Sequence, residues 1–569
     1  AEPPLDLPTE DCTYIGYTTF REGLKKFGLK REDRTCHFYA VGKTGTGKST
    51  LFKNMIIQDM RNGEGVGVMD PHGDLIEDLL EYVPDNRIDD VIIFDPSDLT
   101  RPTALNVLEC PNPAQKNLMA SGLVSAIRNY FENSWGPRLE YLLNNSVLTL
   151  LEVPRTTLLG VTRILADKNY QKYIVHRVKD PVIKDFWERE FKQMMGNVAF
   201  HTEAIQPIQN KIGRFLASST IRNILGQAYS TIRFDEIMNQ GKILFINLSK
   251  GKIGDDNANL LGGLIVSRLN FMAMQRVNIP PKDRRDFYFY VDEFQNFASG
   301  SFASILSEAR KYRLNLHLTH QYTAQLPEEM LDAVIGNVGT MAVFSLGSND
   351  AKALAPAFLP DLEETDLISL ERHHIYIKMM IDGMTRPPFS AVTLPLPTEE
   401  EKTHNGEKVR ELSRQKYGTD GAVVEERIKR WTEKQFDLGL AVAEDEKDEK
   451  DRQTASQVVS PVVGPMAIPV ENTSAAANGI KTAGEISPPA ENLTVPISVN
   501  NIPEPTVKVE VKPGAVTTIY PLKERVFESP VNPDRKEEAT PAPNNNEIPG
   551  SRGGTAPSLL NETGTGKGE

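Results

Sequence analysis

Short apolar runs alternate with amphipathic stretches over the first hundred residues of the chain. The runs at 35–41, 65–69 and 91–94 have the length of buried strands, and each is followed by a glycine or an aspartate. The stretches at 49–60 and 74–83 have the spacing of helices. Because parallel strands need a crossover that is usually a helix, this alternation predicts a parallel α/β sheet covered by helices on both faces.

The pattern changes between about residues 112 and 234. Apolar positions recur there at helical spacing, and no segment has the pattern of a strand. One helix face is formed by Leu139, Leu142, Leu143, Val147, Leu150 and Leu151. We therefore predict an all-α domain inserted into the α/β fold.

Apolar runs of strand length return after this helical segment. Four more strands are predicted at 243–248, 287–291, 314–319 and 341–346. A closing β-hairpin is expected around Asp382-Gly383, with its strands at 374–381 and 389–394. Two short helices, near 407–417 and 422–436, complete the folded part.

These elements divide the chain into five parts. The α/β domain consists of two parts, 12–110 and 236–397, and the all-α insert between them covers 111–235. A short helical extension follows at 398–437, and a tail covers 438–569. From residue 451 onward the chain holds 16 of its 38 prolines, and Tyr520 and Phe527 are the only aromatic residues. Such a segment buries too little apolar surface to offset its ordering entropy, so we predict a disordered, Pro-rich, acidic tail.

Charge is spread unevenly along the chain. The net charge is −13, yet residues 111–235 carry 16 basic and 10 acidic residues, while residues 441–569 carry 12 basic and 19 acidic ones. Between Glu203 and Asp235 the charged residues are all basic: Lys211, Arg214, Arg222 and Arg233. Such a basic segment is compatible with a surface that binds phosphates. A helix face that is simply exposed to solvent explains the same charges equally well.

Other patterns exclude further classes of site. The three cysteines have no metal-ligand spacing, which favours reduced thiols in a cytosolic protein, and no apolar run reaches the length of a membrane span. We expect no metal at His72, His373 or His374. The chain begins with Ala1, so an N-terminal membrane anchor could have been lost.

Residues 42–49 fit the pattern G-x-x-x-x-G-K-[ST]. In this motif the glycines let backbone N–H groups surround the β-phosphate, Lys48 reaches the β- and γ-phosphates, and the Ser49 hydroxyl binds Mg²⁺. The motif stands between a buried strand and a helix, as the mechanism requires. The predicted ATP-binding residues are Gly42, Lys43, Thr44, Gly45, Thr46, Gly47, Lys48, Ser49 and Thr50.

Two adjacent acids follow the apolar strand at 287–291. We expect Asp292 to hold Mg²⁺ together with Ser49, and Glu293 to orient and deprotonate the attacking water. Gln321 ends the next strand and would contact the γ-phosphate or the water. A glutamine at a strand end is more often an ordinary loop residue, so this role depends on its place beside the acids.

Arg310 ends the helix that leads into the strand of Gln321. We expect it near the catalytic edge of the sheet, where a guanidinium would stabilise charge that develops on the phosphoryl group. A solvated cation at a helix C-terminus explains the same residue equally well.

Taken together, these motifs resemble type IV coupling proteins, the TraG/TraD-like ATPases of conjugation, within the wider HerA/FtsK group. The likeness covers about residues 12–395 and includes the all-α insert. The matching segments are 42–49, Asp70-Pro-His-Gly-Asp74, Ile246-Asn-Leu-Ser249, Val291-Asp-Glu-Phe294, Glu308-Ala-Arg310 and Thr319-His-Gln321.

The resemblance implies a RecA-like P-loop ATPase that translocates DNA. It implies a ring, expected to be a homo-hexamer, with ATP sites between subunits and DNA in the central channel. By carry-over, Lys48 and Ser49 bind nucleotide and Mg²⁺, Asp292 coordinates Mg²⁺, Glu293 activates water and Gln321 senses the γ-phosphate. Arg310 would act on the neighbouring subunit's site.

The resemblance also implies partners and a location. The expected partners are DNA, single-stranded and bound without sequence preference, and the proteins of a secretion channel. The expected location is the cytoplasm, at the cytoplasmic face of the inner membrane. Family members often carry N-terminal membrane helices, which no segment of this sequence matches, so the resemblance implies membrane association only through an N-terminal segment that this sequence does not contain.

Two other functions compete with this one. The first is a soluble DNA pump of the HerA/FtsK type, against which the all-α insert argues. The second is an ATP-binding scaffold that recruits secreted protein cargo and hydrolyses little ATP. The pair Asp292-Glu293 argues against a scaffold, because a scaffold has no need of an acid that activates water.

Overall fold

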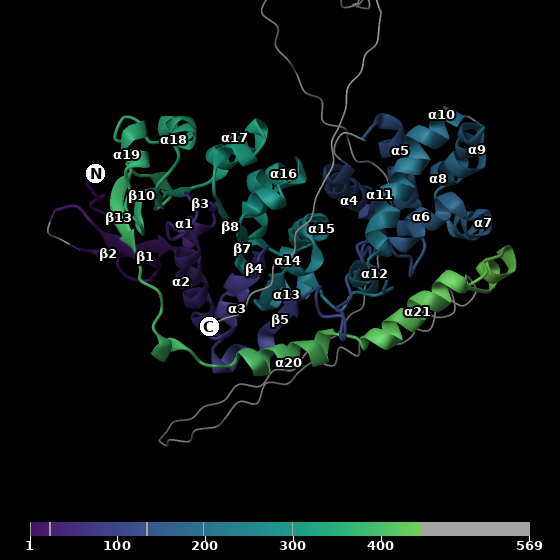
Figure 1. The fold of residues 1–569 in the computed structure, drawn as a ribbon, viewed down its shortest axis with the longest axis horizontal. Helices are drawn as coiled ribbons and strands as arrows, with labels where there is room; N and C mark the ends of the chain where they lie inside the picture. Colours follow the sequence, from purple (N-terminus) through teal and green to yellow (C-terminus); the bar gives the residue numbers. More distant parts are fainter. Residues whose placement is uncertain (1, 22–23, 132–134, 197, 299, 445–569) are drawn as a thin grey trace, which may run out of the picture. The chain divides into compact units, whose positions relative to one another are not determined.

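The computed structural model describes residues 2–21, 24–131, 135–196, 198–298 and 300–444. At its centre is an eleven-stranded sheet in the order β2-β1-β13-β10-β9-β3-β8-β7-β4-β6-β5 (Figure 1). The seven neighbouring strands from β9 to β5 run parallel to one another. The mostly parallel α/β sheet predicted from the sequence is confirmed.

All seven parallel strands lie at predicted positions and are buried along their whole length. Strands covered on both faces read as continuous apolar runs, which is why the pattern was visible in the sequence. The strands are β3 (Phe38–Val41), β4 (Gly65–Asp70), β5 (Val91–Phe94), β6 (Ile243–Asn247), β7 (Phe287–Val291), β8 (Leu314–His320) and β9 (Thr340–Val343).

The strand β3 begins three residues later than the apolar run suggests. Residues 35–37 form a turn after the short helix α1 (Arg31–Arg34), and His37 has a φ of 66°. The Leu316 amide donates to His37 Nδ1 at 3.0 Å, and His37 Nε2 lies 3.1 Å from the Leu306 carbonyl oxygen. These backbone contacts hold the histidine in the left-handed region and keep it out of the strand.

Four antiparallel strands extend the sheet beyond β9. They are β10 (His374–Lys378), β13 (Phe389–Thr393), β1 (Cys12–Thr18) and β2 (Lys26–Lys30). The predicted hairpin is confirmed by the pairing of β10 with β13. Its tip is a small ribbon of β11 (Met380–Ile381) and β12 (Met384–Thr385), with Asp382 and Gly383 at positive φ in the turn. The strands β1 and β2 have no counterpart in the sequence prediction.

Helices cover both faces of the sheet. Alternate residues of β7 point to opposite sides: Tyr288 and Tyr290 join one hydrophobic core, while Phe287, Phe289 and Val291 join the other. The first core includes α2 (Lys48–Arg61) and α3 (Asp74–Leu80); the second includes α15 (Asp255–Met274) and α16 (Gly300–Glu308). Shorter helices complete the domain: α13 (Phe234–Gln240), α14 (Lys250–Ile253), α17 (Glu328–Asn337), α18 (Ser348–Leu354) and α19 (Glu364–Ile368).

A buried ion pair fixes α2 against the sheet. Both terminal nitrogens of Arg34 donate to the Asp59 carboxylate at 2.7 Å. The Tyr290 hydroxyl donates to the same carboxylate at 2.6 Å and accepts from Arg34 at 2.8 Å, while the guanidinium lies 3.7 Å from the centre of the Tyr288 ring. A bidentate pair with its lone pairs satisfied in this way holds its geometry tightly, so the helix that begins at Lys48 has a fixed position.

The described residues between 112 and 234 contain helices and no strand, as predicted. The first of these helices packs along α15 of the α/β domain. The helices are α4 (Lys116–Phe131), α5 (Pro137–Glu152), α6 (Leu159–Ala166), α7 (Lys168–Arg177), α8 (Pro181–Asp185), α9 (Phe191–Met195), α10 (Val198–Phe200), α11 (Gln206–Ala217) and α12 (Ser219–Leu225). Of the helices in the described part of the chain, none combines the length and apolar character needed to cross a bilayer.

Residues 406–444, which we call the strap, connect the edge of the sheet to the all-α insert (Figure 1). Its helix α20 (Gly406–Tyr417) contacts β5, and the Ile93 amide donates to the Ser413 hydroxyl at 2.8 Å. Its helix α21 (Gly421–Glu433) contacts α12, and the tail predicted from residue 438 is helical up to Glu444. From residue 445 onward that tail lies outside the described residues.

Candidate active site

The carboxyl ends of five neighbouring strands carry the residues singled out by the sequence. In sheet order these strands are β3, β8, β7, β4 and β6. The strand β3 leads into the glycine-rich loop, β8 is followed by Gln321, and β7 is followed by Asp292. The strands β4 and β6 end at Asp70 and Asn247. Ligand sites of open α/β sheets form at this edge, so the topology brings together residues as far apart in the sequence as Gly42 and Gln321.

The glycine-rich loop needs its glycines for their backbone conformation. Gly45 has a φ of 77° and Gly47 a φ of 123°, both in the region that disfavours a side chain. A Cβ on Gly47 would lie 2.7 Å from Nδ1 of His373, whose amide donates to the Thr46 carbonyl at 2.8 Å. The helix α2 follows directly, with no side-chain cap and no acid in its first turn. Its amino end therefore offers N–H groups and a positive dipole to an anion.

Lys48 closes the loop on itself. Its ammonium donates to the carbonyl oxygens of Gly42 at 2.7 Å and Lys43 at 3.2 Å, and its side chain is buried. Burial lowers the pKa of Lys48, and the nearby Glu293 and Asp292 act in the opposite direction. The ammonium thus faces the two acids across the mouth of the loop.

Asp292 is a buried carboxyl group at the end of β7. It accepts a hydrogen bond from the Thr319 hydroxyl, and its amide donates to the Met69 carbonyl at 3.0 Å. Burial is the main cause that raises the pKa of Asp292 to about 6, helped by Glu293 and Asp70, while the Thr319 hydrogen bond and Lys48 lower it. The group therefore titrates just below neutral pH.

Glu293 is held by two amide side chains. Gln321 Nε2 donates to its Oε1 and Gln295 Nε2 to its Oε2, each at 2.8 Å. The carbonyl oxygen of Gln321 in turn accepts from the Thr44 hydroxyl at 2.9 Å. Gln321 therefore links the glycine-rich loop directly to the carboxylate. Glu293 itself has a φ of 48°, a costly conformation for a residue with a side chain, of the kind found at functional sites.

Two supporting residues were missed or underused by the sequence reasoning. Gln295 lies in the short turn Phe294–Asn296 after the acids, and no pattern marks it. Thr319 belongs to the segment Thr319-His-Gln321, which matches the family. Because β8 pairs with β7, its contact with Asp292 could have been predicted from the order of the strands. Asp70 accepts from the amides of His72 and Leu75 and so fixes the start of α3.

Arg310 lies at the other edge of the sheet, which corrects the placement expected from the sequence. It stands in the turn Ala309–Tyr312 before β8, whereas Gln321 follows the end of that strand. A helix delivers the chain to the amino end of a parallel strand, so the seven residues of β8 separate the two side chains by roughly 20 Å. The exposed Arg310 lines a hollow of about 560 Å³ with His37, Asn337 and Lys378.

The oxygen groups at the catalytic edge suit Mg²⁺. Asp292 offers a carboxylate and Ser49, in the first turn of α2, an exposed hydroxyl. Mg²⁺ prefers oxygen ligands and is usually held by one or two protein groups together with phosphates and water. Within the described ranges no cluster of three or more His, Cys, Asp or Glu residues has the arrangement of a metal site. Asp292 and Ser49 therefore fit the metal only as part of a nucleotide complex.

Comparison with solved structures places this fold among known proteins. The bacterial conjugative coupling protein TrwBdeltaN70, in its unbound monoclinic form, is 15% identical, covers 67% of this chain and 89% of its own, and has a TM-score of 0.50. TrwB in complex with the ATP analogue ADPNP is 15% identical over 69% of this chain and 97% of its own, with a TM-score of 0.48. VirB4 of Thermoanaerobacter pseudethanolicus is 14% identical over 69% and 99%, with a TM-score of 0.47.

A family model gives the more specific result. No curated protein matches the chain. The model of the type IV secretion-system coupling protein DNA-binding domain matches residues 24–361, more than half of the 569 residues. The RecA-like fold class, the resemblance to coupling proteins and DNA as a partner are thereby confirmed. The chain belongs to the family of type IV secretion-system coupling proteins that is defined by this DNA-binding domain.

Proposed function

We propose that this chain is an ATP-hydrolysing motor that moves DNA towards a type IV secretion channel. The observation that carries the proposal is the connected set Thr44–Gln321–Glu293 beside Lys48 and Asp292. A loop that binds phosphates, an acid for Mg²⁺ and a carboxylate aligned by an amide are the parts that phosphoryl transfer to water requires. TrwB, a coupling protein, is described in complex with ADP and Mg²⁺ and with the ATP analogue ADPNP.

In this proposal the loop residues 42–50 hold the phosphates of ATP. Ser49 and Asp292 hold Mg²⁺, which neutralises charge on the β- and γ-phosphates when bound. Glu293 accepts a proton from water as the water oxygen attacks the γ-phosphorus, and the bond to ADP breaks. Gln321 senses the γ-phosphate, because its amide joins Glu293 to the Thr44 hydroxyl on the loop.

We further propose that the active form is a homo-hexameric ring. In it, Arg310 acts on the ATP site of the neighbouring subunit, since its own subunit's site is a strand length away. DNA would pass as a single strand without sequence preference. The proposed partners are the proteins of a secretion channel at the cytoplasmic face of the inner membrane.

ATP hydrolysis with and without DNA tests this function. The full chain should hydrolyse ATP slowly by itself and several-fold faster with an unspecific single-stranded oligonucleotide. Stimulation by double-stranded DNA alone would favour a pump of the HerA/FtsK type. Negligible hydrolysis under both conditions, with ATP binding intact, would favour the scaffold.

Replacing Lys48 by alanine should remove ATP binding. The ammonium is the one cation that the loop positions over its own carbonyls, and it supplies the point charge for the β- and γ-phosphates. Titration with a fluorescent ATP analogue measures the effect. The matched control is Lys43→Ala in the same loop, which loses an exposed side chain but keeps the backbone N–H through which this position contributes, so it should bind ATP normally. Unchanged affinity in Lys48→Ala would refute the P-loop assignment.

Binding of Mg²⁺ should weaken as the pH falls through about 6, because that is the pKa of Asp292 and only the ionised carboxylate attracts the metal. Thr319→Val removes a hydrogen bond that lowers this pKa, so the midpoint should move to higher pH. Titrations of Mg²⁺ between pH 5 and 8 in the presence of an ATP analogue measure both midpoints. Asp292→Asn should leave only the weaker pH dependence that the terminal phosphate of the nucleotide contributes, whose second pKa is about 6. A midpoint that does not move in Thr319→Val would contradict the assignment.

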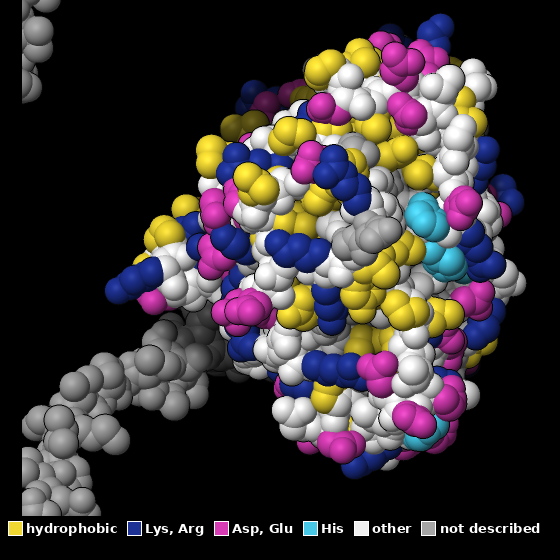
Figure 2. All heavy atoms as spheres, turned by 90° about the vertical axis from the view of Figure 1, so that its left-hand side faces the viewer, with side chains coloured by type: hydrophobic (Ala, Val, Ile, Leu, Met, Phe, Trp, Pro, Cys, Tyr) yellow, Lys and Arg dark blue, Asp and Glu magenta, His cyan; other side chains and the backbone are white. Residues whose placement is uncertain are grey.

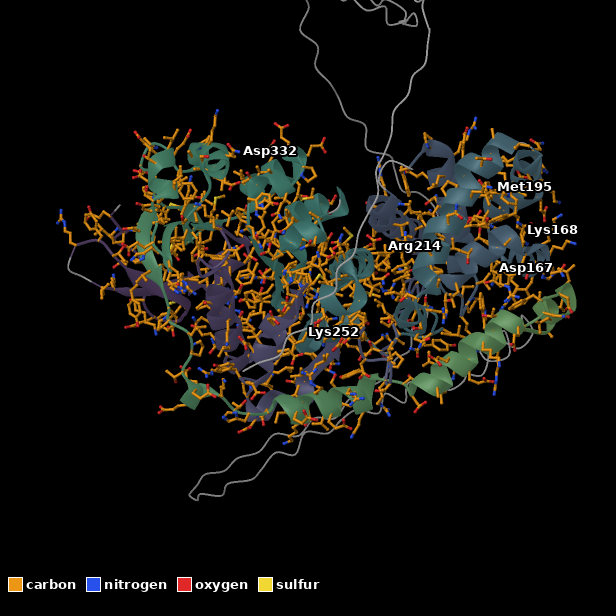
Figure 3. All side chains as sticks on the ribbon, in the orientation of Figure 1. Asp167, Lys168, Met195, Arg214, Lys252 and Asp332 are labelled. Carbon is orange, nitrogen blue, oxygen red and sulfur yellow. The ribbon has the colours of Figure 1, made fainter. Side chains whose placement is uncertain are left out.

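The proposed DNA contact of the insert rests on Lys211 and Arg214 of α11 rather than on Arg222. Arg214 is exposed (Figure 3) and has no ion-pair partner in the described part of the chain. Arg222 instead donates to the carbonyl oxygens of Leu216 and Ala217 at the end of α11, which gives it a structural role. On the face drawn in Figure 2, basic and acidic side chains are interspersed, and no large surface of one sign is visible there.

Neutralising Lys211 and Arg214 together should reduce the salt dependence of DNA binding. Each lost phosphate contact lowers the slope of log K against log salt by about 0.7 for single strands, so the double variant should lose about 1.4. Fluorescence anisotropy from 50 to 300 mM salt measures the slope. The exposed pair Lys168 and Lys172 of α7 provides a matched control. An unchanged slope in the double variant would place the DNA contact elsewhere.

A further inference from the structure

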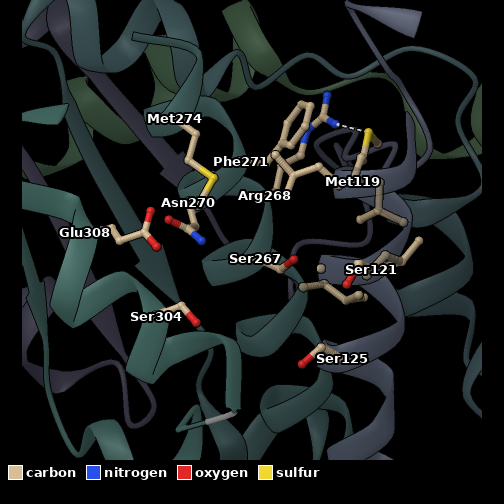
Figure 4. Close-up of a pocket in the computed structure, with 15 residues that line it drawn as sticks. Met119, Ser121, Ser125, Ser267, Arg268, Asn270, Phe271, Met274, Ser304 and Glu308 are labelled. Atoms are coloured by element: carbon tan, nitrogen blue, oxygen red, sulfur yellow. Dashed lines mark hydrogen bonds between the residues drawn. The ribbon is translucent and has the colours of Figure 1, made fainter. Parts of the chain in front are cut away.

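Two hollows lie on either side of α4, the first helix of the insert. The first, which we call the α15 hollow, has a volume of about 400 Å³ and is enclosed by α4, α15 and α16 (Figure 4). The second, the α5 hollow, has a volume of about 850 Å³ and lies between α4 and α5. Ser121 and Ser125 line both. The two hollows therefore meet at two small side chains of α4, which offer little steric obstruction to an extended chain that passes over the helix.

The α15 hollow has an apolar wall and a set of available polar groups. Met119, Phe271 and Met274 contribute to the wall. Among the residues that the structure describes, several polar side chains facing the hollow make no hydrogen bond or ion pair with protein. They are Ser121, Ser125, Ser267, Asn270 and Glu308, from three different helices (Figure 4). An apolar hollow with convergent polar groups is the usual form of a ligand site.

A buried cation in the wall also lacks a good acceptor. Arg268 is 7% exposed, and its one hydrogen bond within the described ranges goes to the Met119 sulfur at 3.4 Å (Figure 4). A thioether is a weak acceptor, whereas a guanidinium carries five N–H donors. Glu109 and Asp235 lie near enough to favour its charge, but neither forms an ion pair with it. A buried charge without an oxygen acceptor in hydrogen-bond contact is costly. The side chain is therefore suited to a carbonyl or carboxylate oxygen brought by a ligand.

The charges of the two hollows distinguish between the chain molecules that fit them. Glu308 lines the α15 hollow, and Glu140 lines the α5 hollow, where Arg128 is the exposed cation. DNA would bring phosphates towards both carboxylates, and its binding depends on several cations. A polypeptide brings carbonyl oxygens for Arg268, amides for the serine and asparagine side chains, and basic side chains for Glu308.

We propose that the two hollows form a docking groove for an extended polypeptide segment that carries a basic side chain towards Glu308. Crossing a helix of about 10 Å diameter takes three or four extended residues, so the groove accommodates a segment of roughly six to eight. Binding of a polypeptide in this groove is a role beyond the movement of DNA. It requires neither ATP nor an assembled motor.

Peptide binding to the full chain tests the groove. The probe is a fluorescein-labelled ten-residue peptide of Ser, Asn and Leu with one central Lys, compared with the same peptide carrying Glu instead. The wild type should prefer the Lys peptide about tenfold or more, the range for a charge-assisted hydrogen bond. Glu308→Lys should reverse that preference. Glu329→Lys, an exposed residue of α17, is the matched charge control and should leave it unchanged.

A steric variant separates the groove from other binding surfaces. Ser121 is exposed and lines both hollows, so Ser121→Tyr should block the crossing, abolish peptide binding and leave ATP and DNA binding intact. No saturable binding of either peptide, or an unaltered preference in Glu308→Lys, would overturn the proposal. Loss of oligothymidylate binding in Ser121→Tyr, with no effect on peptides, would assign the groove to single-stranded DNA. A failure of the motor function would instead appear in the ATP hydrolysis assay and leave peptide binding unaffected.

Discussion

Replacing Arg310 by alanine should lower ATP turnover by about 10³–10⁵-fold while ATP binding remains normal. An arginine supplied to a neighbouring site stabilises charge in the transition state of phosphoryl transfer by this amount. Arg310 is exposed at the amino end of β8, away from its own Lys48 and Glu293, so a contribution within one subunit is sterically excluded. Steady-state hydrolysis and analogue binding measure the two properties separately. Lys311→Ala, at the exposed neighbouring residue, is the matched control.

Mixing inactive subunits tests whether Arg310 acts in trans. Arg310→Ala and Glu293→Gln subunits, each inactive by itself, should regain partial activity together, because some interfaces then pair an intact Arg310 with an intact Glu293. Native mass spectrometry establishes that mixed rings form. If mixed rings form and remain inactive, Arg310 does not act in trans. Normal turnover in Arg310→Ala by itself would make Arg310 an ordinary solvated cation at a helix C-terminus.

Replacing Glu293 by glutamine should lower turnover by about 10²–10⁴-fold, the range for general-base catalysis. Both carboxylate oxygens of Glu293 accept from amide groups of Gln321 and Gln295. The amide of a glutamine at position 293 cannot accept a proton from water. Its NH₂ group would also face the NH₂ group of Gln321 or Gln295, and two donors cannot form a hydrogen bond. Binding of ATP and Mg²⁺ should persist, since Lys48 and Asp292 are unchanged.

A second variant keeps the base and changes its position. Glu293→Asp retains the carboxylate but shortens its reach by one methylene, and an intermediate loss is expected. Single-turnover hydrolysis with tightly bound ATP measures the chemical step in both variants, and Glu329→Gln on α17 serves as the control. Hydrolysis near the wild-type rate in Glu293→Gln would show that another residue activates the water.

The sequence predicted the parallel strands because burial on both faces leaves continuous apolar runs such as that of β7. The glycine-rich loop was predictable because its backbone conformation demands glycine at Gly45 and Gly47. The strands β1 and β2 escaped prediction because they extend one edge of the sheet, where the alternation of β1 is interrupted by a bulge between Tyr14 and Gly16.

The finer arrangement of the site depended on tertiary contacts. Gln295 holds Glu293 from a turn of three residues, which no periodicity can mark. Arg310 was misplaced because its proximity to the strand of Gln321 in sequence was treated as proximity to the catalytic edge. Residues that precede a parallel strand, such as Arg310, lie at its amino end, whereas the catalytic residues follow the carboxyl ends of the strands.

The strap changes how the insert can move as a body. The insert joins the α/β domain through its two ends and through the packing of α4 along α15. Arg163 of the insert donates to the carbonyl oxygens of Trp431 and Lys434 at 2.7 Å, while Arg414 holds Asp98 next to β5 at 2.8 Å. The strap thus adds a separate connection, from α6 and α12 of the insert to the edge strand β5. A displacement of the insert is therefore transmitted through the strap to the edge of the sheet as well as through α15.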